Sequence, residues 1–312
     1  MSAGCLIVSS AAREFADEIA RTSDTPIPIS ACTTVDEALN CYAGEAVLFG
    51  DPDMLAMVLP QLRKIEWVQS TWAGVTPLIE LDRRDYILTG VKDVFGPQIS
   101  EYVMGYLLAH ELKVLERMRQ QRKGNWFTER SGVLHGKRVG IMGTGSIGTY
   151  IANVAKHFGL DVTGLNRSGL PSAGFNSVLP VSRLHEFLHG LDYLVATLPD
   201  AAGTNMLLNE AAFATLPAHA YLVNVGRGNV IDGDALIAAL QGDELAGAAL
   251  DVFDEEPIAE DSPLWNAPNL TITAHIAAIS HPSLIVPIFL KNYRRFCENQ
   301  TLDYIVDFDK GY

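Results

Sequence analysis

Hydrophobic and polar positions in the first 95 residues predict short strands that alternate with helices. Continuous apolar runs at residues 5–8 and 46–49 have the length and residue types of buried strands, and residues 67–70 have a similar pattern. Between them, the apolar side chains of residues 11–21 recur at helical spacing. Because strands that alternate with helices form parallel sheets, we expect a parallel sheet in this part of the chain.

A second alternating series begins near residue 137. Its first strand, residues 138–142, is followed by a helix at residues 146–158. Further short apolar segments predict the remaining strands: residues 161–165, 193–196, 221–224, 247–250 and 270–273. About six parallel strands with helices between them indicate a doubly wound sheet. The fold class expected from both halves is α/β, with two doubly wound parallel sheets.

The segments between and after the two series predict how the chain is divided. Residues 98–122 carry apolar side chains near helical spacing and predict one long helix. The second series is complete before another helical pattern begins at residue 283. We therefore expect a discontinuous substrate domain, residues 1–97 and 284–312, with a cofactor-binding Rossmann domain, residues 98–283, inserted in a flavodoxin-like fold.

Composition and charge narrow the class of partner. Of the 312 residues, 48% are hydrophobic and 19% are charged, as expected of a folded globular protein rather than a disordered one. The formal net charge is −14, which disfavours nucleic acid and anionic lipid because both are negatively charged. An anionic ligand would have to be bound locally, by backbone amides and a few well-placed cations.

Cysteines and apolar segments indicate the compartment. The four cysteines show no C-x-x-C pairing and are interpreted as reduced thiols. No stretch approaches the roughly 18 uninterrupted apolar residues of a membrane span, and the N-terminus lacks the basic leader of a signal peptide. We expect a cytoplasmic protein with no membrane segment and no metal site.

A glycine-rich loop joins the strand at residues 138–142 to the helix that follows it. The loop consists of Gly143, Thr144, Gly145, Ser146, Ile147 and Gly148, a G-x-G-x-x-G pattern between a strand and a helix. Gly143 allows a tight turn, Gly145 lets a pyrophosphate approach the backbone, and Gly148 lets the helix pack on the strand. Because free N–H groups and the positive helix end bind phosphate without basic side chains, the loop predicts a dinucleotide cofactor.

The end of the next strand predicts which dinucleotide is bound. A cofactor without a 2′-phosphate is usually held there by an acid that accepts from the ribose hydroxyls. This chain has Asn166 at that position, followed by Arg167 and Ser168. A guanidinium can bind a 2′-phosphate through two charge-assisted hydrogen bonds, whereas a carboxylate would repel it. We therefore expect NADP(H) to be preferred, with NAD(H) as the alternative.

Four further segments carry a recognisable pattern. They are Leu198-Pro199 with Thr204 downstream, Val223–Gly228, Leu250–Pro257 and Thr273–Ala277. With the glycine loop, their order and spacing resemble those of the D-isomer-specific 2-hydroxyacid dehydrogenases over nearly the whole chain. The most similar branch is the bacterial NADPH-dependent glyoxylate/hydroxypyruvate reductases of type A, which share Trp72–Val75, Ser262–Trp265, His275–Ala278 and the ending Lys310–Tyr312. The resemblance implies an oxidoreductase that acts on a small 2-keto or 2-hydroxy acid as a homodimer.

The resemblance also implies three catalytic residues, and their chemistry fits the reaction. Reduction of a 2-keto acid needs a cation for the carboxylate, a proton donor at the carbonyl oxygen and a hydride. Arg227 follows a strand and lies between two glycines, so it can hold the carboxylate and polarise the carbonyl. His275 can give and take a proton near neutral pH, and Glu256 would orient its ring and favour the imidazolium form.

Other binding positions follow from the same resemblance. Ala73, Gly74 and Val75 match the loop whose backbone amides bind the substrate carboxylate. The remaining cofactor positions are Leu198, Pro199, Thr204, Val225, Gly226 and Asp251, of which Asp251 matches the acid that accepts from the nicotinamide carboxamide. The chain departs from the family at Ala274, where a proline is usual, and at Ala277 and Ala278, which replace a glycine. These departures change the shape of the pocket, so glyoxylate, hydroxypyruvate and similar 2-keto acids all stay candidates for the substrate.

Three alternatives share this fold. Formate dehydrogenases have a glutamine where this chain has Glu256, and phosphoglycerate dehydrogenases often carry a C-terminal regulatory domain for which this chain ends too soon. A dinucleotide-sensing interaction protein, similar to the C-terminal-binding corepressors, would keep the same three catalytic residues. The acidic surface disfavours it, and steady turnover of NADPH with a keto acid would exclude it.

Overall fold

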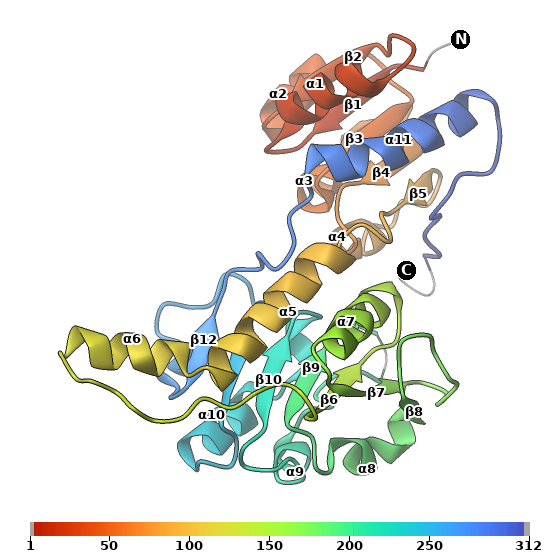
Figure 1. Cartoon of the computed structure of the whole chain (residues 1–312). Helices are drawn as coiled ribbons and strands as arrows, with labels where there is room; N and C mark the ends of the chain where they lie inside the picture. The colour runs from red at the N-terminus through yellow and green to blue at the C-terminus, as the bar shows by residue number, and fades with distance from the viewer. Residues whose placement is uncertain (1–2, 202, 309–312) are drawn as a thin grey trace. The chain divides into compact units, whose positions relative to one another are not determined.

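The computed structural model describes residues 3–201 and 203–308. The chain divides into two compact units. Unit 1 is Met1–Val94 with Ser280–Tyr312, and unit 2 is Phe95–Ile279. Each is a sheet covered by helices (Figure 1). The ending Lys310–Tyr312, which contributed to the family resemblance, lies outside the described residues.

Unit 1 is built on a five-stranded parallel sheet. Its strands are β1 (Cys5–Val8), β2 (Ile29–Cys32), β3 (Val47–Gly50), β4 (Trp67–Ser70) and β5 (Ile87–Thr89), in the spatial order β2-β1-β3-β4-β5. This order is the flavodoxin-like winding. Every residue of β1, β3 and β4 is buried, as expected of parallel strands covered by helices on both faces.

The last helix of the chain completes the core of unit 1. The helices of this unit are α1 (Ala12–Thr22), α2 (Val35–Cys41), α3 (Pro52–Val58), α4 (Thr76–Ile79) and α11 (Pro282–Cys297), with a 3₁₀ turn at Leu59–Gln61. Phe289 of α11 stacks on Phe49 of β3 and on Trp67 of β4, with ring centroids 4.6 and 5.5 Å apart. These buried aromatic contacts attach the C-terminal helix to the N-terminal sheet.

Unit 2 is built on a seven-stranded parallel sheet. Its strands are β6 (Arg138–Met142), β7 (Asp161–Asn166), β8 (Ser177–Pro180), β9 (Tyr193–Ala196), β10 (Tyr221–Asn224), β11 (Gly247–Leu250) and β12 (Leu270–Ile272). The spatial order is β12-β11-β10-β9-β6-β7-β8. The order reverses between β6 and β9, where ligands bind in doubly wound folds, outside the carboxyl ends of the strands. The expected α/β class with two doubly wound parallel sheets is confirmed.

The helices of unit 2 lie on both faces of its sheet (Figure 1). They are α5 (Gly96–Glu111), α6 (Val114–Arg122), α7 (Ser146–His157), α8 (Leu184–Leu188), α9 (Glu210–Phe213) and α10 (Gly233–Gln241). Short 3₁₀ turns lie at Val181–Arg183, Gly228–Val230 and Pro263–Asn266. Among the described residues, no helix combines the length and the apolar content needed to cross a lipid bilayer.

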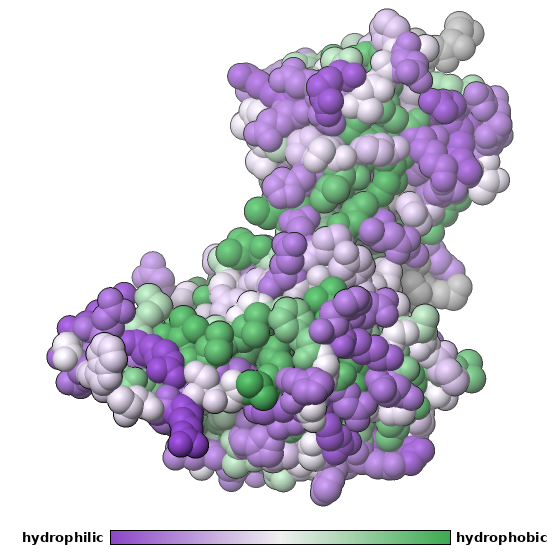
Figure 2. All heavy atoms as spheres, viewed as in Figure 1, coloured by the Kyte–Doolittle hydropathy of each residue, from purple (hydrophilic) through white to green (hydrophobic). Residues whose placement is uncertain are grey.

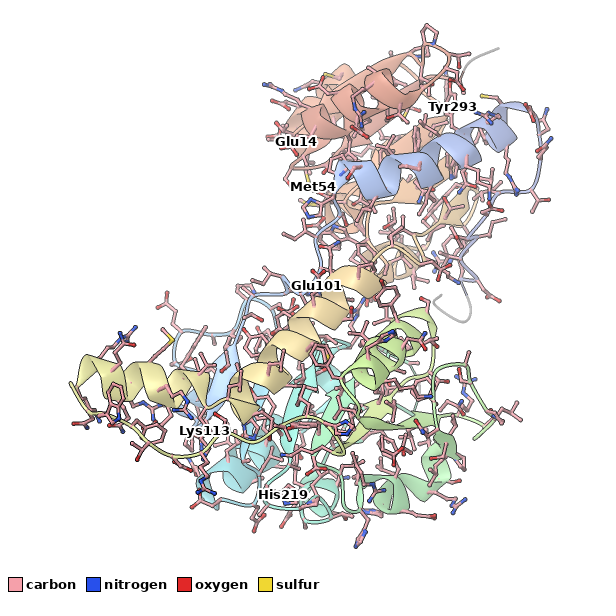
Figure 3. All side chains as sticks on the ribbon, in the orientation of Figure 1. Glu14, Met54, Glu101, Lys113, His219 and Tyr293 are labelled. Carbon is pink, nitrogen blue, oxygen red and sulfur yellow. The ribbon has the colours of Figure 1, made fainter. Side chains whose placement is uncertain are left out.

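The prediction of one helix over residues 98–122 is wrong. The segment forms α5 and α6, separated at Leu112 and Lys113, and Lys113 has a left-handed φ of 54° (Figure 3). Apolar spacing continues across the break, but burial does not, since α6 has no buried residue. No glycine or proline marks the break. Periodicity therefore identified an apolar face without showing that its second half is exposed.

Three strands escaped the sequence analysis. β2, β5 and β8 lie at sheet edges, and β2 and β8 are only partly buried. Edge strands carry mixed polar and apolar residues, so they lack the continuous apolar runs that marked the central strands. With β8, the second sheet has seven strands rather than about six.

Candidate active site

The glycine loop has the geometry that a phosphate-binding turn requires. Gly143 follows β6 with a φ of 103°, a conformation that favours glycine. A Cβ at Gly148 would lie 1.9 Å from the carbonyl oxygen of Gly143, so the helix can approach the strand only because this position is glycine. Both glycines are therefore explained by the fold of the protein itself.

Gly145 is different, because nothing in the described protein requires it. A Cβ built there meets no atom within 4 Å. Gly145 caps α7 with no side-chain hydrogen bond, and the first N–H groups of this helix, including those of Ser146 and Ile147, have no partner within the helix. An open approach to unpaired backbone N–H groups fits an incoming phosphate. The loop thus fits the dinucleotide that the sequence predicts.

The loop after β7 holds Asn166 tightly and leaves Arg167 free. The Asn166 amide donates to Oγ1 of Thr144 at 3.0 Å and to the carbonyl of Leu170 at 3.1 Å. Its oxygen accepts from the backbone N–H groups of Ser168 and Gly169. Asn166 therefore shapes the loop. Arg167 is exposed and has no hydrogen bond or ion pair with any residue that the structure describes, so its guanidinium is available to an anion.

The loop after β9 is closed by a threonine. Oγ1 of Thr204 lies 3.0 and 2.8 Å from the carbonyl oxygens of Pro199 and Ala201, either of which can accept its single proton, and it accepts from the N–H of Ala201. Leu198 is buried, and its backbone lies against Gly226, where a Cβ would come within 2.6 Å of the Leu198 carbonyl oxygen. The segments after β9 and β10 are thus in backbone contact.

Arg227 sits on a short, rigid connection after β10. Gly226 and Gly228 lie on either side of it, and neither position has room for a side chain. A Cβ at Gly228 would lie 1.8 Å from the carbonyl carbon of Phe253. The buried amide of Asn224 accepts from the Gly226 N–H and donates to the Arg227 carbonyl, both at 3.0 Å. These contacts fix the backbone from which the guanidinium projects.

The charge of Arg227 is partly desolvated. Burial lowers the pKa of Arg227 from its ordinary value, while the negative charges of Glu256 and Asp200 act in the opposite direction. Arginine remains a cation in proteins. Arg227 therefore presents a positive charge from a poorly hydrated position, where it attracts an anion more strongly than in bulk water.

His275 and Glu256 form a direct pair. Nδ1 of His275 lies 2.8 Å from Oε2 of Glu256, and the other carboxylate oxygen accepts from the backbone N–H of Phe253 at 2.9 Å. The ring is half-exposed. With Nδ1 bonded to the carboxylate, Nε2 is left to exchange a proton with a ligand. A ring held in this way is suited to general acid–base chemistry.

Asp251 contacts the backbone of the segment that carries this histidine. Its buried carboxylate accepts from Oγ1 of Thr273 at 2.6 Å and from the N–H groups of Ile276 and Ala277 at 2.9 and 2.8 Å. Its backbone carbonyl accepts from the His275 N–H at 2.8 Å. One oxygen therefore takes two hydrogen bonds and the other takes one, which leaves a single acceptor position for a ligand.

In unit 1, the loop that contains Ala73, Gly74 and Val75 follows β4 and precedes α4. Their backbone N–H groups donate to no residue in the described part of the chain. Oγ1 of Thr71, two residues before Ala73, donates to the Asp51 carboxylate at 2.6 Å and lies 3.1 Å from the Gly50 carbonyl oxygen, which anchors the start of the loop. Three neighbouring unpaired amides suit an anion such as a carboxylate.

Six sequence-predicted segments of unit 2 follow strands of one parallel sheet. The glycine loop follows β6, Asn166–Ser168 ends β7, Leu198 follows β9, Arg227 follows β10, Asp251 follows β11 and His275 follows β12. Carboxyl ends of parallel strands share one edge of the sheet, so all six lie along that edge. No group of three or more His, Cys, Asp or Glu side chains is arranged to hold a metal ion in the described residues.

Sequence analysis missed the residues that hold these loops. Asn224 supports the Arg227 loop, and Tyr102 reaches Thr273, with the two hydroxyl oxygens 2.7 Å apart. A buried asparagine at the end of a strand is a signal that could have been used, because a buried amide needs partners. Tyr102 gives no such signal, since its partner is distant in the sequence.

Comparison with known proteins identifies the family of this chain. The family model of the D-isomer specific 2-hydroxyacid dehydrogenase NAD-binding domain matches residues 104–277. Glyoxylate/hydroxypyruvate reductase A of Serratia proteamaculans is 33% identical over 257 residues, which cover 80% of this chain and 82% of the relative.

Solved structures give the same result over the full length. A D-isomer specific 2-hydroxyacid dehydrogenase family protein from Aeromonas salmonicida is 37% identical, with a TM-score of 0.94, and the match covers 99% of this chain and all of that one. An NADPH-dependent glyoxylate/hydroxypyruvate reductase from Sinorhizobium meliloti, in complex with NADP and sulfate, is 25% identical with a TM-score of 0.85, over 99% of this chain and 100% of that one.

Proposed function

The chain belongs to the D-isomer specific 2-hydroxyacid dehydrogenase family, an enzyme family with an NAD-binding domain, and we propose that it reduces a small 2-keto acid with NADPH. The balanced reaction converts the 2-keto acid, NADPH and a proton into the 2-hydroxy acid and NADP⁺. Glyoxylate and hydroxypyruvate are the first candidate substrates, because the similar reductases are named for them.

The observation that carries the proposal is the His275–Glu256 pair. Its 2.8 Å contact orients the imidazole so that Nε2 is free for the substrate oxygen. In reduction, His275 donates a proton to the carbonyl oxygen, and in oxidation it accepts the proton back. Glu256 holds the ring in place through its contact with Nδ1. Arg227 binds the substrate carboxylate and polarises the carbonyl, since it is a cation on the same sheet edge.

The cofactor assignment rests on the two loops after β6 and β7. The residues that would hold the dinucleotide are Gly143, Thr144, Gly145, Ser146, Ile147 and Gly148 at the pyrophosphate, and Asn166, Arg167 and Ser168 at the ribose. Arg167 is the unpaired cation that a 2′-phosphate needs, which favours NADPH over NADH. Leu198, Pro199, Thr204, Val225, Gly226 and Asp251 complete the proposed pocket. When bound, the cofactor supplies the hydride.

Unit 1 contributes substrate binding in this proposal. The unpaired amides of Ala73, Gly74 and Val75 are suited to bind the carboxylate of the keto acid. We therefore assign the substrate domain to residues 1–97 and 284–312, and the cofactor domain to residues 98–283. The four cysteines are free thiols, which suits an enzyme of the reducing cytoplasm.

We also propose a homodimer, because the described residues leave the apolar side chains of α6 exposed. This nine-residue helix has no buried residue, and such short helices are unstable without tertiary packing. Exposed apolar side chains gather around the junction of α5 and α6, as Figure 2 shows; they are Leu112, Val114, Leu115 and Met118, with Trp126 beyond them at 94% exposure. A second copy would cover this apolar surface.

A panel of 2-keto acids, each assayed with NADPH and with NADH, tests the proposed activity. We expect steady NADPH consumption at about 1–10³ per second with at least one short keto acid. Binding of NADPH without turnover of any keto acid would instead indicate a dinucleotide-sensing protein. In a parallel measurement of mass in solution, Leu115→Glu with Met118→Glu should give monomers, whereas Met57→Glu, at a more exposed apolar position in unit 1, should not.

A further inference from the structure

The segment that carries His275 has no regular secondary structure and an unfavourable backbone. After β12 ends at Ile272, residues 273–279 form neither helix nor strand. His275 has a φ of 54°, a left-handed conformation that is rare for residues with a side chain. Such a conformation persists only when surrounding contacts hold it. The position of the imidazole therefore depends on what anchors this segment.

Asp251 anchors the middle of the segment through the N–H groups of Ile276 and Ala277. The two ends are held by α5, the helix that carries Glu101 in Figure 3. At one end, the Tyr102 hydroxyl lies 2.7 Å from Oγ1 of Thr273. At the other, the Gln98 amide donates to the carbonyl of Ile279 at 3.0 Å and accepts from its N–H at 2.9 Å.

The donor in the contact between Tyr102 and Thr273 follows from the number of hydroxyl protons available. Oγ1 of Thr273 has one proton and donates it to the Asp251 carboxylate at 2.6 Å. The proton between Tyr102 and Thr273 must therefore come from the tyrosine. Burial raises the pKa of Tyr102, so its hydroxyl remains protonated and can donate. Tyr102, Thr273 and Asp251 thus form one chain of hydrogen bonds.

We propose that Gln98 and Tyr102 of α5 are positioning residues that set the orientation of His275 for proton transfer. They are four residues apart and so lie on one face of the helix. Neither side chain is assigned a contact with the substrate or the cofactor. This inference rests on the proposed function for its effect on turnover, but the anchoring itself does not depend on that function.

α5 also packs on α7, so it can align the segment that carries His275 with the glycine loop. A Cβ at Gly96 would lie 2.7 Å from the ring of Tyr150 on α7, so the two helices are in close contact. The N-terminus of α7 carries the glycine loop. α5 therefore connects residues 273–279 with the glycine loop, which is proposed to hold the cofactor. Loss of the contacts of Gln98 and Tyr102 should affect kcat more than cofactor binding.

The test compares Tyr102→Phe and Gln98→Leu with the matched control Tyr150→Phe. Tyr150 touches the same helix, but its hydroxyl bonds to no residue in the described ranges. Amide hydrogen exchange of residues 273–279 reports the anchoring without any assay of activity. We expect exchange at Ile276 and Ile279 to rise about fivefold in the two variants, as for the loss of a net hydrogen bond, and to stay unchanged in the control.

Turnover provides the second readout. In Tyr102→Phe and Gln98→Leu, kcat should fall about fivefold or more while KM for NADPH stays within about twofold. At the central position, Thr273→Ser keeps the hydroxyl and should retain most of the activity that Thr273→Val loses. Because a general loss of folding would also change the melting temperature and KM, this pattern distinguishes positioning from a purely structural role.

Two results would overturn the inference: unchanged exchange in both α5 variants, or faster exchange with an unaltered kcat. If the wild-type protein reduces no keto acid, the proposed function fails. The exchange measurement then decides by itself whether α5 anchors the segment, so the two failures can be told apart.

Discussion

Removal of the Arg167 side chain is the sharpest test of the cofactor assignment. Arg167 is exposed and is bonded to no residue that the structure describes, so Arg167→Ala should cost the fold little. The folded protein thus gives no reason for a cation at this position. The proposed reason is the 2′-phosphate of NADPH, which a guanidinium can bind through two charge-assisted hydrogen bonds.

The expected magnitude follows from the exposure of this site. Hydrogen bonds to charged groups contribute about 1.5–3 kcal/mol, and solvent around Arg167 favours the lower end of that range. About 1.5 kcal/mol is roughly tenfold in affinity. We therefore expect the wild type to prefer NADPH by at least about tenfold in kcat/KM, and Arg167→Ala to lose most of that preference through weaker use of NADPH alone.

Steady-state kinetics with both cofactors provide the assay, with Lys156→Ala as the control. Lys156 is an exposed cation at the far end of α7, so its removal changes the net charge equally without touching the glycine loop. Kinetics with NADH should stay within about twofold in both variants. Equal use of NADH and NADPH by the wild type would refute the reasoning, and unchanged NADPH kinetics in Arg167→Ala would assign the contact to another residue.

The remaining predictions concern the proposed catalytic residues and the glycine loop. Arg227→Ala should reduce kcat/KM at least about a hundredfold with little change in melting temperature, and a variant with near-normal kinetics would remove Arg227 from the mechanism. Glu256→Ala should lower kcat about tenfold or more with little change in KM for NADPH, because the imidazole of His275 loses the Nδ1 contact that orients it. A wild-type kcat would contradict this role. Gly148→Ala should destabilise the protein, because its Cβ would overlap the Gly143 carbonyl oxygen. A Cβ at Gly145 meets no protein atom, so Gly145→Ala should mainly weaken cofactor binding. Calorimetry and NADPH titration distinguish the two variants, and equal losses of stability would contradict the assignment.

Central strands and the glycines of the loop after β6 were predictable because their physical signals are local. A buried parallel strand such as β10 is a short apolar run, and a turn such as that at Gly143 needs a residue that tolerates positive φ. The break at Lys113 carries no such signal. Whether the apolar face of α6 is buried depends on what packs against it, which a single sequence does not encode locally.

The candidate site shows the same division between local and distant signals. Residues at strand ends, such as Arg227 and His275, could be identified by their position and residue type. Their supports could not, because the contacts of Gln98 with Ile279 and of Tyr102 with Thr273 join positions more than 170 residues apart in sequence. Asn166 illustrates a further limit: its amide donates within the loop and so shapes it, which its residue type alone did not indicate.

Hydride transfer from labelled cofactor tests the central claim most directly. The wild type is incubated with NADPH that carries deuterium at the transferable C4 position and with the keto acid that the panel selects, and the product is analysed by mass spectrometry and chiral separation. The account predicts one deuterium at C2 of the 2-hydroxy acid, with the D configuration where the keto acid selected gives a chiral product. It also predicts at least about a hundredfold less product with His275→Gln. A product without deuterium, or a wild-type rate of formation in His275→Gln, would contradict it.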